Sequence, residues 1–202
     1  MYRTQPFGTL LELAMTKTAT KTVWTIDAAH AELAFSVRHL MINNVRGRFG
    51  KLEGTVTVDD VNPNDSKVDV SVDVASIDTR QEMRDNHLRS ADFFDAANHP
   101  KMHFVSKRIV GDVSKDFQII GDLTIRGTTR EIELKAHLEG RGKDPWGNER
   151  AGFSLTGTIN RHDFGLDYNQ ALEAGGVMVG AEVKMTFDVE IFHKLEALTA
   201  AA

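Results

Sequence analysis

Apolar and polar residues alternate along most of this chain. The stretch VDVSVDV at residues 68–74 places its valines on one side and Asp, Ser and Asp on the other. The same pattern occurs in REIELKAHLEG at 130–140 and in GAEVKMTFDVEIF at 180–192. A period of two is typical of a β-strand with one face in an apolar core and the other face in water.

The pattern predicts eight main strands and a further short strand at Val23–Ile26. Besides the three stretches above, the alternation covers Leu33–Arg38, Val45–Val58, Met102–Val110, Phe117–Ile125 and Phe153–Asn160. Turn signals separate these strands, namely Pro63 and Asn64 in DDVNPNDSK, Gly127 in IRGTTRE, and the polar loop GRGKDPWGNER. Helices do not alternate with the strands, which disfavours a parallel sheet and favours an antiparallel barrel or sandwich.

Two stretches interrupt the alternation. The first, DTRQEMRDNHLRSADFFDAANHPK at 78–101, predicts a helix over Thr79–Arg89 with Asp78 as its N-cap. The second, NRHDFGLDYNQALEAGG at 160–176, has no assigned element. We therefore expect one all-β domain, an eight-stranded antiparallel barrel with a short helical insertion near 79–95.

The inward faces of the predicted barrel consist almost entirely of Val, Ile, Leu, Met, Phe and Ala. A barrel of about eight strands either fills its interior with side chains or holds one small ligand. The strand Val45–Val58 would span roughly 46 Å at ~3.3 Å per residue, and we expect Gly47, Gly50 and Gly54 to bend it. A long apolar tube suits an elongated apolar ligand, but alternation alone does not separate a lined cavity from a filled core.

Charge and length exclude several classes of protein. The chain has 202 residues, a formal net charge of −5 and no cysteine. No block of five like charges occurs, which argues against a nucleic-acid partner. No stretch approaches the ~20 apolar residues of a transmembrane segment. Leu10–Leu11 is followed at once by Glu12, so the apolar run is too short for a secretory signal and we expect a cytoplasmic protein.

The chain divides into three segments by its pattern of apolar and polar residues. We expect residues 1–22 to be a disordered N-terminal extension, with Met15 as an alternative start to Met1. Residues 23–192 would form the barrel, and residues 193–202 a C-terminal tail.

A metal site is the first chemical alternative, in the stretch DNHLRSADFFDAANHPKMHF at 85–104. The candidate ligands there are His87, His99, His103, Asp85 and Asp95. His99 precedes Pro100, which disfavours the helix that would align His99 with His103, and we expect His103 to face water. The motifs H-E-x-x-H and G-x-S-x-G and the P-loop are absent from the sequence. We therefore assign no metal ligand and no catalytic residue.

Four longer motifs follow one another along the chain. They are WTIDAAHAELAFSVRHLMINNVRGRFGKLEGTV, ASIDTRQEMRDNHLRSADFFDAANHPKMHF, GDLTIRGTTREIEL and GTINRHDFGL. They contain a His-Leu pair, then V-x-G-x-F, D-x-H-L-x-S-x-D-F-F-D and R-x-x-F-G. Together they resemble the YceI-like family of polyisoprenoid-binding proteins, over about Trp24 to Phe192.

The resemblance implies a lipocalin-like, extended barrel that binds a long-chain isoprenoid lipid in its bore, for transport or storage. A polyisoprenoid or an isoprenoid quinone would be the ligand, with no other cofactor, no catalysis, and a homodimer as the assembly. Some members of the family carry a secretory signal and are periplasmic, and this sequence departs from them there. The alternative is an enzyme or metal-dependent protein that acts on such a lipid.

Two groups of candidate site residues follow. The apolar candidates for the lining of the bore are Phe35, Val37, Phe49, Met83, Leu88, Phe93, Phe94, Met102, Phe104, Phe164 and Met178. The candidates for binding a quinone or pyrophosphate head group are Arg38, His39, His87 and Arg161, which can donate hydrogen bonds. We expect the stretch 85–104 to be a gate, with Met83 and Leu88 turned toward the bore and Phe93 and Phe94 closing its end. The alternatives are ordinary core packing for the apolar residues and ion pairing for the arginines.

Overall fold

The computed structural model describes residues 21–171 and 176–194, which form ten strands and one α-helix. The strands are β1 (Lys21–His39), β2 (Asn43–Phe49), β3 (Leu52–Asp59), β4 (Lys67–Asp73), β5 (Ile77–Asp78), β6 (Lys101–Gly111), β7 (Asp116–Ile125), β8 (Thr128–Lys143), β9 (Glu149–Asn160) and β10 (Val179–His193). The helix is α1 (Glu82–Arg89), and three short 3₁₀ turns are η1 (Pro63–Asp65), η2 (Val74–Ser76) and η3 (Arg161–Phe164). Residues 1–20 of the expected N-terminal extension, the alternative start at Met15 and most of the C-terminal tail lie outside the described residues. The last two residues assigned to that extension, Lys21 and Thr22, instead begin β1.

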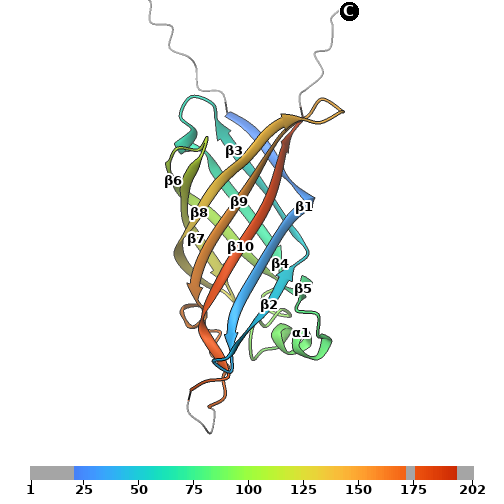
Figure 1. Cartoon of the computed structure of the whole chain (residues 1–202), viewed down its shortest axis with the longest axis vertical. Coiled ribbons are helices and arrows are strands. Elements are labelled where there is room, and N and C mark those ends of the chain that lie inside the picture. Colours follow the sequence, from blue (N-terminus) through green and yellow to red (C-terminus); the bar gives the residue numbers. More distant parts are fainter. Residues whose placement is uncertain (1–20, 172–175, 195–202) are drawn as a thin grey trace, which may run out of the picture.

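Eight of the strands close into an antiparallel barrel, as the alternation predicts. The ring runs β1-β3-β4-β6-β7-β8-β9-β10 and closes through the pairing of β10 with β1. The strands tilt strongly against the long axis (Figure 1). β2 and β5 lie outside the ring and extend the sheet beside the second half of β1.

Two predicted strand boundaries are wrong. The short strand at Val23–Ile26 and the strand at Leu33–Arg38 are parts of one strand, β1, whose pairing with β10 shifts register between Ile26 and Ala31. The predicted strand Val45–Val58 is two strands, β2 and β3, broken at Gly50–Lys51. The first half of β1 pairs with β3 and the second half pairs with β2. The break at Gly50–Lys51 therefore separates the two partners of β1.

The glycines of this segment act differently from one another. Gly50 lies at the break itself. Gly47 and Gly54 lie inside strands, where a Cβ atom would be 2.5 Å from the Phe35 ring and 2.4 Å from the Asp69 carbonyl oxygen respectively. The predicted bend is therefore present at Gly50, whereas Gly47 and Gly54 permit close packing.

The predicted turns are confirmed. Pro63 begins η1, between β3 and β4. Arg126 and Gly127 join β7 to β8 with φ values of 49° and 74°, the left-handed pair that suits a tight hairpin.

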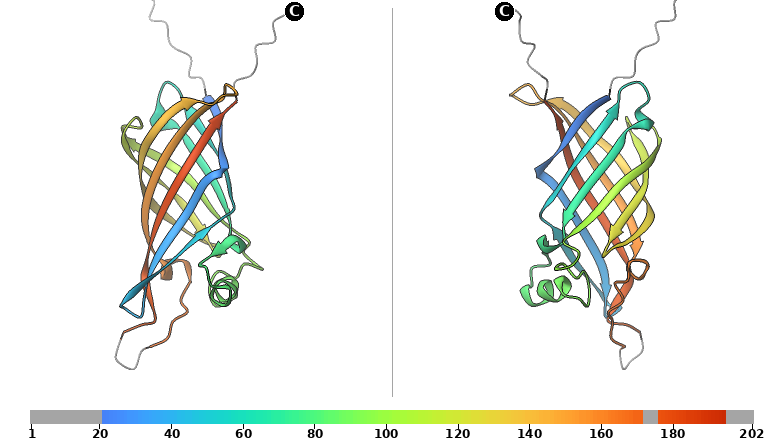
Figure 2. Two further views of the ribbon diagram at one scale, coloured as in Figure 1. Left: turned by 45° about the vertical axis from the view of Figure 1, so that its right-hand side comes forward. Right: turned by 180° about the vertical axis from the view of Figure 1, so that it is seen from behind.

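The helix begins later than the sequence predicts. Gln81, not Asp78, is its N-cap, and its side chain accepts a hydrogen bond from the Arg84 amide. The Asp78 carboxylate instead accepts from the Arg80 amide at 2.8 Å. Helix α1 lies beside the lower end of the barrel, against β5, within the segment that connects β4 to β6 (Figure 2).

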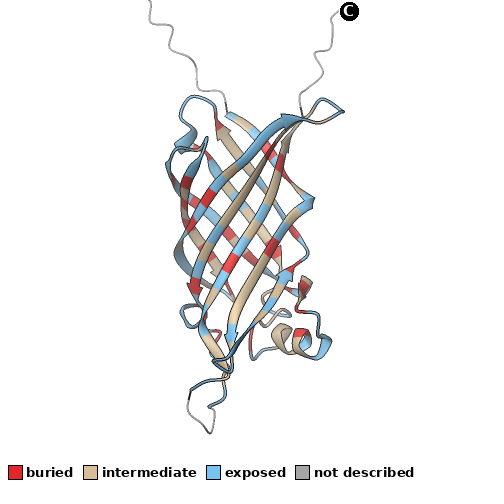
Figure 3. Ribbon diagram, viewed as in Figure 1, coloured by how far each residue is buried: buried red, intermediate tan, exposed pale blue. Residues whose placement is uncertain are grey.

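Burial follows the alternation. Along most strands of the ring, buried or half-buried bands alternate with exposed ones (Figure 3). β7 is the clearest case, since every second residue from Phe117 to Ile125 is buried. The most completely buried large side chains are Phe164, Ile77 and Val74, which lie in or beside the irregular segments rather than in the middle of the barrel.

Candidate functional site

The barrel encloses a cavity of about 660 Å³. This volume lies within the ~300–1,000 Å³ range of ligand pockets in proteins. All eight strands of the ring contribute side chains to its wall. The cavity reaches from α1, where Leu88 lines it, to the β3–β4 connection and the end of β8, where Pro63 and Lys143 line it. We call these two ends of the barrel the α1 end and the far end.

The wall of the cavity is the inward face that the alternation predicts. β10 supplies Val183, Met185, Phe187, Val189 and Ile191 to it. β4 supplies Val68, Val70 and Val72 in the same way. The polar residues between them face water, so a period of two in the sequence produces an apolar bore and a charged outer surface.

Eight of the predicted lining residues lie on the cavity wall. They are Phe35, Val37, Phe49, Leu88, Phe93, Phe94, Met102 and Phe104. Contact of these residues with a ligand stays a prediction. Other residues on the cavity wall, such as Phe117, Phe153 and Phe187, were not among the predicted lining residues, although the same alternation indicates them.

Three predicted lining residues lie elsewhere. Met83 is 78% exposed, because it lies on the side of α1 opposite the buried Asp85 and the wall residue Leu88. Phe164, the last residue of η3, is 1% exposed and packs in the core instead of lining the cavity. Met178 lies beside the β1–β2 turn, where its carbonyl accepts from the Leu40 amide.

The α1 end is covered by aromatic side chains from both irregular segments. The Phe94 ring meets the Phe49 ring edge-on, with centroids 5.8 Å apart. Phe93 packs against Tyr168, at 5.1 Å, and against His87, also at 5.1 Å. The two stretches that interrupt the alternation thus meet over this end, and the predicted closing position of Phe93 and Phe94 agrees with their place on the wall.

Arg161 is the predicted head-group residue that reaches the cavity. Its side chain is on the wall and the residue is only 3% exposed. Its guanidinium donates to the carbonyl oxygens of Gly180, Leu166 and Val179. Burial lowers the pKa of Arg161 from its usual value, and the Asp167 carboxylate partly opposes this shift. Neither the ion-pair alternative nor exposure to water describes this arginine.

The other three head-group candidates are outside the cavity wall. The Arg38 Nε donates to the Met41 carbonyl at 3.1 Å, so this arginine braces the β1–β2 turn. His39 is half-buried at the end of β1, opposite Val179. The His87 Nε2 lies 2.8 Å from a carboxylate oxygen of Asp92, and its ring packs on Tyr168.

The histidines of the stretch 85–104 do not gather around one point. His87 pairs with Asp92, whereas His103 pairs with Asp69 at 2.7 Å on the outer face of β6. His99 lies against the turn at Gly127. Asp85, another candidate ligand, is buried and accepts from the Thr79 amide at 2.9 Å.

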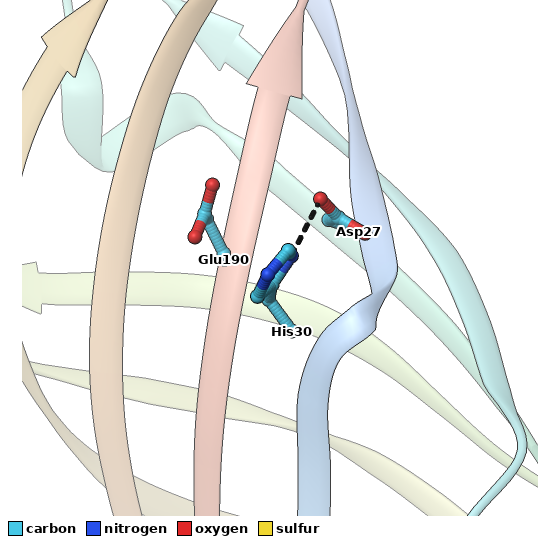
Figure 4. Close-up of side chains that lie close together, drawn as sticks. All are labelled: Asp27, His30 and Glu190. Carbon is cyan, nitrogen blue, oxygen red and sulfur yellow. Dashed lines mark hydrogen bonds and ion pairs between the residues drawn. The ribbon is translucent and has the colours of Figure 1, made fainter. Parts of the chain in front are cut away.

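A different cluster has the residue types of a metal site. Asp27, His30 and Glu190 each place a ligand atom within 4.8 Å of the others, beside the kink of β1 (Figure 4). However, Arg150 donates to both carboxylates, at 2.8 Å for Asp27, and to Asp144 at 2.9 Å. Hydrogen bonds from Arg150 and then from His30 hold the pKa of Asp27 at about 2. The guanidinium supplies the positive charge here, so the cluster ties the kink of β1 to β9 and β10.

Charged residues also border the far end. Arg141, Lys143 and Glu149, around the β8–β9 connection, lie on the cavity wall together with Asp60. In the sequence, this connection shows only the composition of a polar loop. Its residues were missed because their place at the barrel rim depends on the closure of the ring.

The fold and the bore together define a lipocalin-like barrel, in which antiparallel strands enclose one apolar cavity. A model of the YceI-like domain matches residues 24–191, and the chain belongs to the YceI-like family. A UPF0312 protein of Staphylococcus epidermidis is 39% identical over 170 residues, which cover 84% of this chain and 96% of that protein.

Two solved structures show the same architecture. The YCEI protein of Campylobacter jejuni is 32% identical, with a TM-score of 0.67 over 78% of this chain and 90% of that one. A polyisoprenoid binding domain from Saccharophagus degradans superposes with a TM-score of 0.62 over 85% of this chain and 98% of that one. It is 15% identical, so that likeness concerns the fold. Within the described part of this chain, the helix is too short and too polar to cross a membrane.

Proposed function

We propose that this protein binds a long-chain isoprenoid lipid, a polyisoprenoid or an isoprenoid quinone, in the bore of the barrel and carries or stores it. The observation that supports this most is the continuous apolar cavity of about 660 Å³. The family and the solved polyisoprenoid binding domain of the same fold support the choice of ligand class.

The volume of the cavity argues for a ligand on energetic grounds. An empty apolar cavity of 660 Å³ leaves wall side chains without van der Waals partners on one side, which is unfavourable. An apolar chain that fills the bore restores the lost dispersion contacts of the wall.

Arg161 is the residue we propose for contact with a polar head group. A guanidinium has five N–H donors. Arg161 uses three of them in hydrogen bonds to backbone carbonyl oxygens, so two donors are available to a ligand. A quinone carbonyl or a phosphate oxygen in the cavity would accept from them. The head group would then lie at the α1 end and the tail would extend toward the far end.

The proposed activity is binding without chemistry. The wall carries one buried cation among apolar side chains, and the Asp27 cluster is already balanced by Arg150. A carrier must also release its cargo. Transfer of the lipid from a bilayer to the bore is close to balance, because the tail is out of water in both places.

Analysis of the lipid bound to protein purified from its own host tests the proposal. The protein should yield a long-chain isoprenoid lipid by organic extraction and mass spectrometry, at close to one molecule per chain. Protein stripped of lipid should take up a polyisoprenoid or quinone again. If native protein repeatedly yields none and stripped protein takes up none, the barrel is not a lipid carrier.

A further inference from the structure

The α1 end of the barrel carries a projecting apolar turn. Leu40, Met41 and Ile42 connect β1 to β2 and are 37%, 52% and 77% exposed. We call these three residues the hairpin tip. The β1–β2 hairpin extends past the ring at the lower end of the barrel (Figure 2). Val177, also exposed, lies next to Gly176, which packs near Met41.

The backbone of the hairpin tip has a conformation that is unfavourable for large side chains. Leu40 and Met41 have φ values of 49° and 60°, in the left-handed region. The Ile42 amide donates to the His39 carbonyl and closes the turn. Such turns usually place Asn, Asp or Gly at these positions. Two large apolar residues that are both strained and exposed do not serve the stability of the fold, and strain of this kind is characteristic of functional sites.

The charged side chains of the β1–β2 hairpin itself are positive. Between residues 38 and 48 the sequence contains Arg38, Arg46 and Arg48 and no acidic residue. Arg48 pairs loosely with Glu32 and Asp78, at 3.4 Å each. Arg38 and Arg46 have no ion pair within the described residues. Apolar side chains beside basic ones are the pattern of an element that inserts at the interface of an anionic bilayer.

We propose that the hairpin tip docks the α1 end of the barrel on an anionic lipid bilayer. This inference rests on the proposed function, since a lipid with a long apolar tail reaches the bore from a membrane. Val37 lines the cavity three residues before the tip, and Val179, opposite His39, also lines it. Insertion of Met41 and Ile42 therefore brings the α1 end of the cavity against the bilayer.

A second copy of the chain fits the hairpin tip less well. A stable dimer buries about 800 Å² per partner and takes ~20–30 residues from each side. A projecting turn of three residues offers much less area than that, whereas insertion into a bilayer needs only a small apolar element beside positive charge.

Flotation with vesicles tests the docking. The full chain is mixed with vesicles of phosphatidylcholine alone, or of phosphatidylcholine with phosphatidylglycerol. The anionic vesicles should carry the protein, and high salt should weaken the binding because it screens the arginines. The double change Met41→Ser, Ile42→Ser should reduce the bound fraction at least tenfold. Arg46→Gln should reduce the preference for anionic vesicles.

The matched control is at the far end. Trp146 is 80% exposed in the β8–β9 connection, so Trp146→Ser removes an exposed apolar side chain from the opposite end. It should leave vesicle binding unchanged. Loss of binding in this variant instead of the tip variant would overturn the proposal, as would equal binding by the tip variant and the wild type. A dimer in light scattering that the tip variant dissociates, without any vesicle binding, would also overturn it.

Two further measurements keep docking separate from folding and from lipid binding. Met41→Gly removes the side chain and the strain at once, so it should bind vesicles less and melt at a higher temperature. Uptake of a detergent-dispersed isoprenoid should be the same for the tip variant and the wild type. Normal uptake without vesicle binding by wild type would refute the docking alone, whereas absence of uptake would refute the proposed function.

Discussion

Arg161 has a structural role, and we propose a binding role for the same side chain. It holds the backbone at Leu166, Val179 and Gly180, and it also lies on the wall of the apolar cavity. A buried cation without a carboxylate partner is costly unless hydrogen bonds satisfy it. A head-group oxygen would satisfy the donors that the carbonyl groups leave free.

Replacement of Arg161 should change which head group the protein prefers. We expect Arg161→Met to lower stability by about 1–3 kcal/mol through the lost hydrogen bonds to the backbone. It should also reduce the preference for a quinone or phosphate head over a plain hydrocarbon of equal tail length. Competition between such lipids, followed by mass spectrometry, measures that preference.

Arg126 offers the matched control for Arg161. It is half-buried, and its Nη1 donates to the Gly165 carbonyl at 3.1 Å, next to the same turn, but it is not on the cavity wall. Arg126→Met should leave the ranking of head groups unchanged. If Arg161→Met also leaves it unchanged, the head group does not contact Arg161.

At the scale of the elements, the kink of β1 depends on charge. Asp27, on the kink, binds Arg150 of β9, which also binds Glu190 of β10. The Asp27 pKa falls from 3.8 to about 2 in the folded protein. A depressed carboxylate pKa stabilises the fold above its unfolded value and loses that contribution as the pH falls through the folded value.

Acid should therefore loosen this part of the barrel. As the pH falls from about 4 to about 2, protonation of Asp27 should lower the unfolding free energy of the wild type by about 1 kcal/mol. The loss is no larger because partial exposure to solvent screens the pair of Asp27 and Arg150. Denaturant titrations at several pH values measure this. Asp27→Asn should be less stable at neutral pH and should show a smaller loss in that range. An identical pH dependence in both proteins would show that the Asp27 pair does not stabilise the fold.

Alternation in the sequence predicted strands well, because it reports on which residues share a face. It could not show that β1 continues through residues 27–30, since the pairing of β1 with β10 and the contact of Asp27 with Arg150 join residues far apart in the sequence. It also could not place the break at Gly50–Lys51, which arises where β1 changes partners. Met83 was misplaced because a helix of eight residues contains too few apolar positions to define its buried face.

At the scale of the whole molecule, the alternation alone did not distinguish a lined cavity from a filled core, and it favoured the filled core slightly. The same Val and Phe residues would satisfy either, because their alternation shows only which way they point. The strand number and tilt decide how wide the ring is, and both emerge only when β10 pairs with β1. From the sequence, only the resemblance to the YceI-like family favours a lined cavity over a filled core.

A barrel around a large apolar cavity should be more stable when loaded. A ligand at a thousand times its Kd stabilises a protein by ~4 kcal/mol, which corresponds to about 8–16 °C in Tm for a chain of this size. Calorimetry of protein stripped of lipid and of reloaded protein measures the difference. Equal melting temperatures would mean that the bore does not hold the lipid in the folded state.

The central claim is that the lipid lies inside the bore, and one pair of variants tests it most directly. Val70 faces the cavity from β4, and Val105, on the neighbouring strand β6, is 39% exposed on the outer face. Val70→Trp should narrow the bore and abolish most of the bound lipid, counted per chain by mass spectrometry. Val105→Trp, the same change on the outside, should keep the full amount. Equal lipid content in the two variants would contradict binding in the bore.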